Sequence, residues 1–89
     1  SDSVRLAALP ATELEALLVA EPDNVAAMLA LANHDILAAQ FERARQRIDA
    51  AYVLAPGLAE VYLSELLYQL YNGLVKLSAM PEGSPPVLP

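Results

Sequence analysis

The stretch PDNVAAMLALANHDILAAQFERARQRIDAAYVLAP, residues 22–56, decides the fold of this chain. It is rich in Ala and Leu, which favour helices, and it lacks the alternation of apolar and polar residues that indicates a strand. Asp23 or Asn24 could accept hydrogen bonds from the first free amides of a helix, so we predict a helix from there to about Ala38. A second helix is predicted from about Phe41 to Leu54.

The apolar residues of these two helices are suited to close packing. They follow helical spacing at Val25, Met28, Leu29, Ala32 and Ile36 in the first helix, and at Phe41, Ala44, Ile48, Ala51 and Tyr52 in the second. Paired helices approach closely where small residues leave room for a neighbour's bulky side chain. We expect gaps at Ala32, Ala44 and Ala51, filled by Met28, Ile48 and Phe41.

Similar helical blocks flank this pair. The block from Thr12 to Glu21 opens with Thr12 and Glu15, spaced as in a capping box. Another runs from about Leu58 to Asn72, where Gly73 could close the helix in a left-handed conformation. Residues Leu74 to Ala79 would add a short fifth helix. The predicted fold class is therefore all-α.

The spacing of two prolines points to a known family. Pro22 and Pro56 are 34 residues apart, which is the period of the tetratricopeptide repeat. Between them stand residues of the types that this family places there: Met28, Leu31-Ala32, Phe41, Ala44, Ile48, Ala51 and the closing Pro56. From Thr12 to Gly73 the chain resembles one full tetratricopeptide repeat with a partial copy on each side. It departs from the family pattern at Asp35, where an aromatic is usual, and at Glu65-Leu66, which replace Leu-Gly.

The resemblance implies a short right-handed superhelix of antiparallel helix pairs over residues 1–80. Residues 81–89 would be a proline-rich tail or linker to a following domain, extended at Pro85-Pro86, with a ligand for an aromatic-lined groove as the alternative. The chain begins at Ser1, and we expect it to be a fragment of a longer protein.

The family also implies a concave surface lined by the first helix of each repeat. Carried over to this chain, the partner-binding residues would be Leu29, Asn33, Ile36, Leu63, Leu67, Leu70 and Tyr71. Members that grip a peptide carboxylate place Lys, Arg and Asn here, and only Asn33 fits. The expected ligand is therefore apolar, such as an amphipathic helix. In the alternative interpretation, these leucines pack against further helices of the parent protein.

The last helix is apolar around most of its circumference, as is typical of a helix that is buried on more than one side. The residues concerned are Leu63, Leu66, Leu67, Leu70, Tyr71 and Leu74. We expect another subunit, a neighbouring segment or a bound peptide to cover them. The sequence thus predicts a protein-interaction module with a helical partner or a homo-oligomer, and the alternative is a structural spacer.

Composition excludes several kinds of site. The chain has no cysteine and a single histidine, so thiolate and multi-histidine metal sites are impossible. Asn33-His34-Asp35 is the one place where catalytic residue types adjoin, but neighbouring residues on a helix point about 100° apart and form no relay. We therefore expect no catalytic residue, metal or cofactor. A net charge of −6 argues against nucleic acid, and no apolar run is long enough for membrane insertion.

The remaining charged residues have structural interpretations. Asp35 lies on the packing face, where a lone carboxylate would be costly, so we predict an ion pair with Arg47 or Arg5. The arginines at positions 43, 45 and 47 are interpreted as a solvated face balanced by Glu42 and Asp49, with recognition of an acidic peptide as the alternative. His34 is expected at the surface or in the groove, as a contact for a partner.

Overall fold

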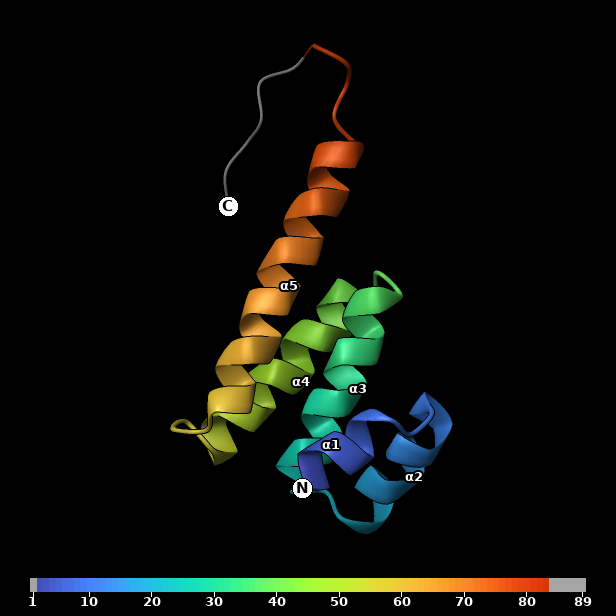
Figure 1. Cartoon of the computed structure of the whole chain (residues 1–89), viewed down its shortest axis with the longest axis vertical. Coiled ribbons are helices and arrows are strands. Elements are labelled where there is room, and N and C mark those ends of the chain that lie inside the picture. Colours follow the sequence, from blue (N-terminus) through green and yellow to red (C-terminus); the bar gives the residue numbers. More distant parts are fainter. Residues whose placement is uncertain (1, 84–89) are drawn as a thin grey trace.

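Five helices and no strand make up residues 2–83, which are the residues that this computed structural model describes (Figure 1). In chain order they are α1 (Asp2–Ala7), α2 (Ala11–Ala20), α3 (Val25–Leu37), α4 (Phe41–Leu54) and α5 (Ala59–Ser78). The predicted all-α fold class is confirmed. The proline-rich tail falls outside the described residues from position 84 onward.

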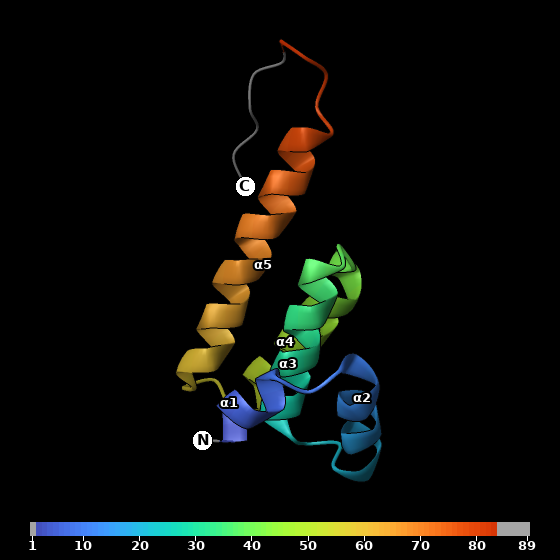
Figure 2. The same ribbon diagram turned by 45° about the vertical axis from the view of Figure 1, so that its right-hand side comes forward.

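The central element is α3, which packs against all four other helices. The chain runs up α3, down α4 and up α5 (Figures 1 and 2), and α4 also contacts α5. The short helices α1 and α2 also pack against α3. Because α3 is surrounded, most of its residues are buried. The right-handed superhelix expected from the resemblance stays a prediction.

The predicted alanine gaps are confirmed. Ala32, Ala44 and Ala51 are all 0% exposed, and they belong to one core cluster. Met28 and Ile48 are buried in the same cluster, and Phe41 packs against it half-buried. The small residues thus allow α3 and α4 to approach, as the sequence predicts.

Of the two helix caps predicted from the sequence, the one at Asn24 is present and the one at Thr12 is not. Asn24 caps α3, since its Oδ1 accepts a hydrogen bond of 3.0 Å from the amide of Ala27. The capping box predicted at Thr12 is wrong, because α2 begins at Ala11 and Thr12 lies inside the helix. Pro10 is the N-cap residue, and its carbonyl oxygen accepts the first helical bonds. Proline lacks an amide hydrogen, but its carbonyl can still begin the helical ladder.

The end of the last helix also differs from the prediction. Gly73 does not adopt a positive φ, and α5 continues through it to Ser78, so there is no separate helix over Leu74–Ala79. A single glycine inside a helix costs only about 1 kcal/mol, which the helix-compatible residues on both sides outweigh. The helix α1, before Pro10, is an addition that the sequence analysis did not predict.

Candidate interaction surface

A pocket of about 420 Å³ lies between α1, α3 and α5. Predicted partner-binding residues from two helices line it: Leu29 and Asn33 from α3, and Leu63 and Leu67 from α5. Val4 and Ala7 of α1 form another wall. We call this cavity the α1/α3/α5 pocket. The α1 wall was not predicted from the sequence, because no helix was expected before Pro10.

The predicted partner-binding residues do not form one surface. Ile36 is buried in the core, so it is closed to any partner in this conformation. Leu29 is also buried, with its side chain at the edge of the α1/α3/α5 pocket. Tyr71 is half-buried against the core cluster, whereas Leu70 is exposed. The face of α3 that was expected to be open is covered, because α1, α2, α4 and α5 all pack on that helix.

Asn33 takes part in the contact between α3 and α5. The hydroxyl of the buried Ser64 donates a hydrogen bond of 3.0 Å to Asn33 Oδ1. Both residues also line the α1/α3/α5 pocket. Their hydrogen bond fixes the spacing of the two helices that form the pocket walls.

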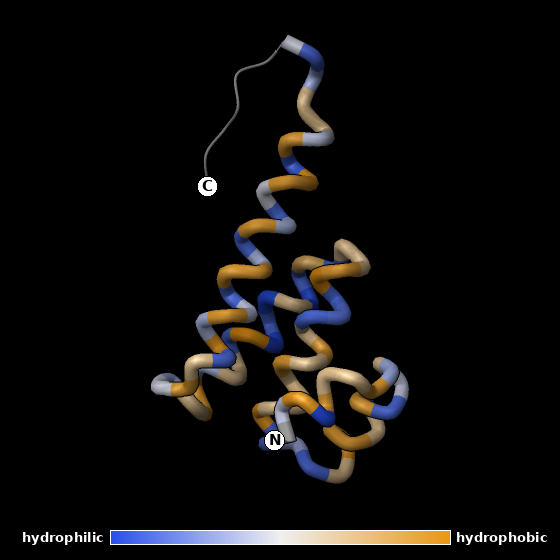
Figure 3. The backbone as a smooth tube through the Cα atoms, in the orientation of Figure 1, coloured by the Kyte–Doolittle hydropathy of each residue, from blue (hydrophilic) through white to orange (hydrophobic). Residues whose placement is uncertain are grey.

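The outer face of α5 carries a row of exposed leucines, which we call the α5 stripe. Leu63, Leu66, Leu70, Leu74 and Leu77 are between 45% and 66% exposed. The opposite face of α5 packs into the protein through the buried Val61 and Ser64 and the half-buried Tyr68. Figure 3 shows the apolar positions recurring along α5, and Figures 1 and 2 show its C-terminal half extending past α3 and α4.

Asp35 is held by two arginines from α4. Asp35 is only 4% exposed, and its carboxylate accepts hydrogen bonds from Arg43 Nη2 at 2.9 Å and from Arg47 Nε at 3.0 Å. The predicted ion pair with Arg47 is confirmed. Arg43, which lies one turn before Arg47, is a second partner. These bonds tie α3 to α4 and satisfy a carboxylate that would otherwise be costly to bury.

Arg45 lies on a different side of α4 and joins it to α5. Its guanidinium donates two hydrogen bonds to Glu65, one of them 2.9 Å long, and another of 3.1 Å to Asp49. It also lies 4.7 Å from the ring centre of Tyr68, which allows a cation–π contact. The Arg45 guanidinium holds the pKa of the Glu65 carboxyl below its ordinary value, although partial burial acts in the opposite direction.

The interpretation of the three arginines as a solvated face holds only for Arg43, whose side chain is 57% exposed, whereas Arg45 and Arg47 are partly buried. Arg43 and Arg47 bind Asp35 on α3, and Arg45 binds Glu65 on α5. The predicted balance by Asp49 holds for Arg45 alone. Residues two apart on a helix point to different sides, so alternate arginines can reach different neighbouring helices. With these partners inside the chain, the arginines are poorly placed to recognise an acidic peptide.

His34 makes a contact within the fold. Its Nε2 donates a hydrogen bond of 3.0 Å to the carbonyl oxygen of Leu9, in the segment between α1 and α2. The side chain is half-buried. The histidine thus ties α3 to the N-terminal helices, and the expectation of a surface contact for a partner does not describe its position.

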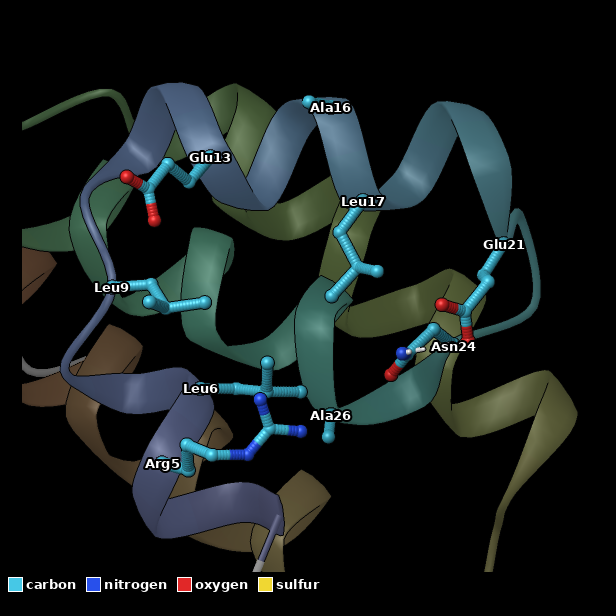
Figure 4. A pocket seen from close by; sticks show the side chains of 9 residues that line it. All are labelled: Arg5, Leu6, Leu9, Glu13, Ala16, Leu17, Glu21, Asn24 and Ala26. Carbon is cyan, nitrogen blue, oxygen red and sulfur yellow. Dashed lines mark hydrogen bonds between the residues drawn. The ribbon is translucent and has the colours of Figure 1, made fainter.

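A second pocket, of about 610 Å³, lies between α1, α2 and the start of α3 (Figure 4). Its lining mixes apolar and polar side chains, among them Leu6, Leu9, Leu17, Glu13 and Glu21. At one end of the pocket, the side-chain amide Nδ2 of Asn24 donates a hydrogen bond of 3.4 Å to Glu21 Oε1. No residue predicted to bind a partner lines this pocket.

Within residues 2–83, no three or more His, Cys, Asp or Glu side chains are grouped so as to hold a metal ion. In the same range, no helix combines the length and hydropathy needed to cross a membrane. Comparison of the chain with protein-family models, with curated proteins and with solved structures finds no match.

Proposed function

We propose that this chain is a protein-interaction module, similar in design to a tetratricopeptide scaffold, and that it binds an apolar or amphipathic helix through the α5 stripe and the adjoining α1/α3/α5 pocket. The observation that carries the proposal is the α5 stripe itself. Its leucines are about half exposed or more, on a helix whose opposite face is already packed in the core.

The exposed leucines of the α5 stripe form a continuous apolar surface. Single exposed leucines are ordinary, but a continuous apolar patch on a soluble protein marks a contact site. The α5 stripe is continuous because its leucines recur at spacings of three and four residues, which place them on one side of a helix. Leu63 belongs to both the stripe and the α1/α3/α5 pocket, so the two apolar surfaces adjoin.

The tetratricopeptide comparison is part of the proposal. The helices α3 and α4 pair through alanine gaps, and α5 packs against both of them. In that family the first helix of each repeat lines a concave surface, and we assign α3 and α5 to that role.

The chemistry of the polar groups favours binding over catalysis. Asp35 is occupied by Arg43 and Arg47, and His34 is occupied by a backbone carbonyl. The net charge of −6 favours a protein partner over nucleic acid, because phosphate binding requires a basic face. The proposal is accordingly a non-enzymatic module.

The test is a titration of a fluorescein-labelled amphipathic helical peptide, with Leu on one face and Lys on the other, followed by fluorescence anisotropy. We expect saturable binding that weakens at least about tenfold in Leu67→Glu and in Leu70→Glu, because each change buries a carboxylate in the apolar contact. The control is Val19→Glu, which adds the same charge at a residue of α2 that is 84% exposed. Equal affinity for all four proteins would refute the docking surface.

A structural spacer is the second candidate. The projection of α5 past α3 and α4 favours it, because a following helix of a longer protein could lie there (Figure 1). A spacer would bind the peptide without saturation or with no difference between Leu70→Glu and Val19→Glu. The same titration therefore separates the two functions.

A further inference from the structure

We propose that the α5 stripe is covered by a second copy of this chain, with the two α5 helices antiparallel and crossing at Leu70. This inference rests on the proposed function, because it assigns an occupant to the same surface. The symmetry of the leucines of α5 favours a second copy over an unrelated helix, and the charges beside them and the space around the helix are compatible with it.

The spacing of the stripe is palindromic. Its leucines stand at 63, 66, 70, 74 and 77, so the intervals are three, four, four and three residues. At 3.6 residues per turn, these positions fall within an arc of about 80°. A two-fold axis through Leu70 then sets Leu63 opposite Leu77 of the second copy and Leu66 opposite Leu74. An interface between identical copies must be self-complementary in this way.

The charges beside the stripe are compatible with self-association. The chain carries a net charge of −6, but neither acidic residue of α5 belongs to the stripe. Glu65 is bound to Arg45, and Glu60 lines the α1/α3/α5 pocket at the Leu63 end of the stripe. Uncharged residues stand beside the stripe at Tyr62 and Gln69, and in an antiparallel pair the two Glu60 residues lie at opposite ends of the interface. Two copies can therefore approach without placing like charges opposite each other.

The space around α5 also suits a second helix. The C-terminal half of α5 stands clear of α3 and α4 in both views (Figures 1 and 2). At the other end, Leu77 of the second copy would lie near Leu63, at the α1/α3/α5 pocket, where Val4 of α1 is exposed. A seam of 20 residues is about 30 Å long and one helix wide. An interface of this length and width buries an area at the low end for specific interfaces. We therefore expect the dimer to dissociate in the micromolar range.

The first test measures mass against concentration. Sedimentation velocity of the unmodified chain, from about 1 µM to several hundred µM, should show a monomer–dimer equilibrium. Leu70→Glu sets two carboxylates opposite each other at the axis and should raise the dissociation constant at least about 100-fold, whereas Val19→Glu should leave it unchanged. Circular dichroism should show that both variants retain their helical signal, since both positions are exposed.

The second test determines the orientation. The chain has no cysteine, so introduced thiols report only the designed contact. In an antiparallel pair, an equimolar mixture of Leu63→Cys and Leu77→Cys should form a mixed disulfide, and neither variant alone should cross-link, because disulfides require Cα atoms within about 7 Å. Cross-linking of Leu63→Cys with itself would overturn the antiparallel arrangement.

The outcomes separate this inference from the proposed function. A chain that stays monomeric at several hundred µM, yet binds the amphipathic peptide through Leu70, overturns self-pairing and leaves the interaction module standing. A dimer that Leu70→Glu does not weaken overturns the α5 interface. A monomer that also fails to bind the peptide overturns both proposals.

Discussion

Substitution of Asp35 by Asn tests the ion pairs that join α3 to α4. The change keeps the size of the side chain and removes the charge that holds Arg43 and Arg47. We expect the folded state to lose about 1–2 kcal/mol, because both charge-assisted bonds weaken while the new amide stays buried. For a chain of this size, that loss lowers the melting temperature by about 4–16 °C.

The size of the stability loss expected for Asp35→Asn follows from the solvent exposure of Arg43 and Arg47. Breaking a fully buried ion pair by removal of one partner costs about 3–5 kcal/mol. Here the carboxylate is buried, but the side chains of Arg43 and Arg47 are 57% and 27% exposed. Each arginine can therefore turn toward water when its partner is lost. Solvent screening of exposed partners also reduces the value of an ion pair, which brings the expected loss below the buried limit.

Thermal denaturation followed by circular dichroism measures this effect. The control is Glu15→Gln, which removes one negative charge at an exposed position of α2 and should change stability by less than about 0.5 kcal/mol. A double-mutant cycle with Arg47→Gln should show non-additive losses, because the two residues share one contact. Equal melting temperatures for Asp35→Asn and Glu15→Gln, or strictly additive losses in the cycle, would refute the role assigned to these ion pairs.

Further predictions concern the pair between α4 and α5, the glycine of α5 and the alanine gaps. Because the pKa of the Glu65 carboxyl lies below its ordinary value of 4.5 in the folded chain, its pair with Arg45 stabilises the fold above that pH and loses its contribution as the pH falls. Glu65→Gln should therefore flatten the decline of melting temperature between about pH 5 and pH 3, and an unchanged decline would contradict this. Gly73→Ala should raise stability by up to about 1 kcal/mol and strengthen the helical signal, since the added Cβ meets no atom within 4 Å apart from the neighbouring backbone of its own helix; a lower melting temperature would show that the site is constrained. Ala44→Leu should cost about 1–3 kcal/mol by overpacking, whereas Ala50→Leu, at an exposed position of the same helix, should be nearly neutral in the same thermal melts.

The predicted partner-binding residues show which parts of an interaction surface can be predicted from sequence and which cannot. The pattern of α3 correctly identified Leu29 and Ile36 as apolar packing positions. Their assignment to a partner-binding surface does not agree with the structure, because both are buried. The unexpected helix α1 also packs on α3 and walls the pocket. On α5, the pattern correctly indicated more apolar surface than one face of the core can cover. The exposed stripe is the part of the predicted site that is open to a partner.

The sequence by itself determined the features that depend on near neighbours in the chain: the helical class, the cap at Asn24, and the placing of the small and bulky apolar residues on one face of α3 and of α4. Hydrogen bonds and side-chain contacts at three and four residues' separation control such features, so they can be predicted from spacing. Only the tertiary structure decided which faces are open, which helices the arginines of α4 reach, and that α5 continues through Gly73. An apolar or charged residue has the same local pattern in a core or on a surface, and the helices that come to lie beside it decide its role.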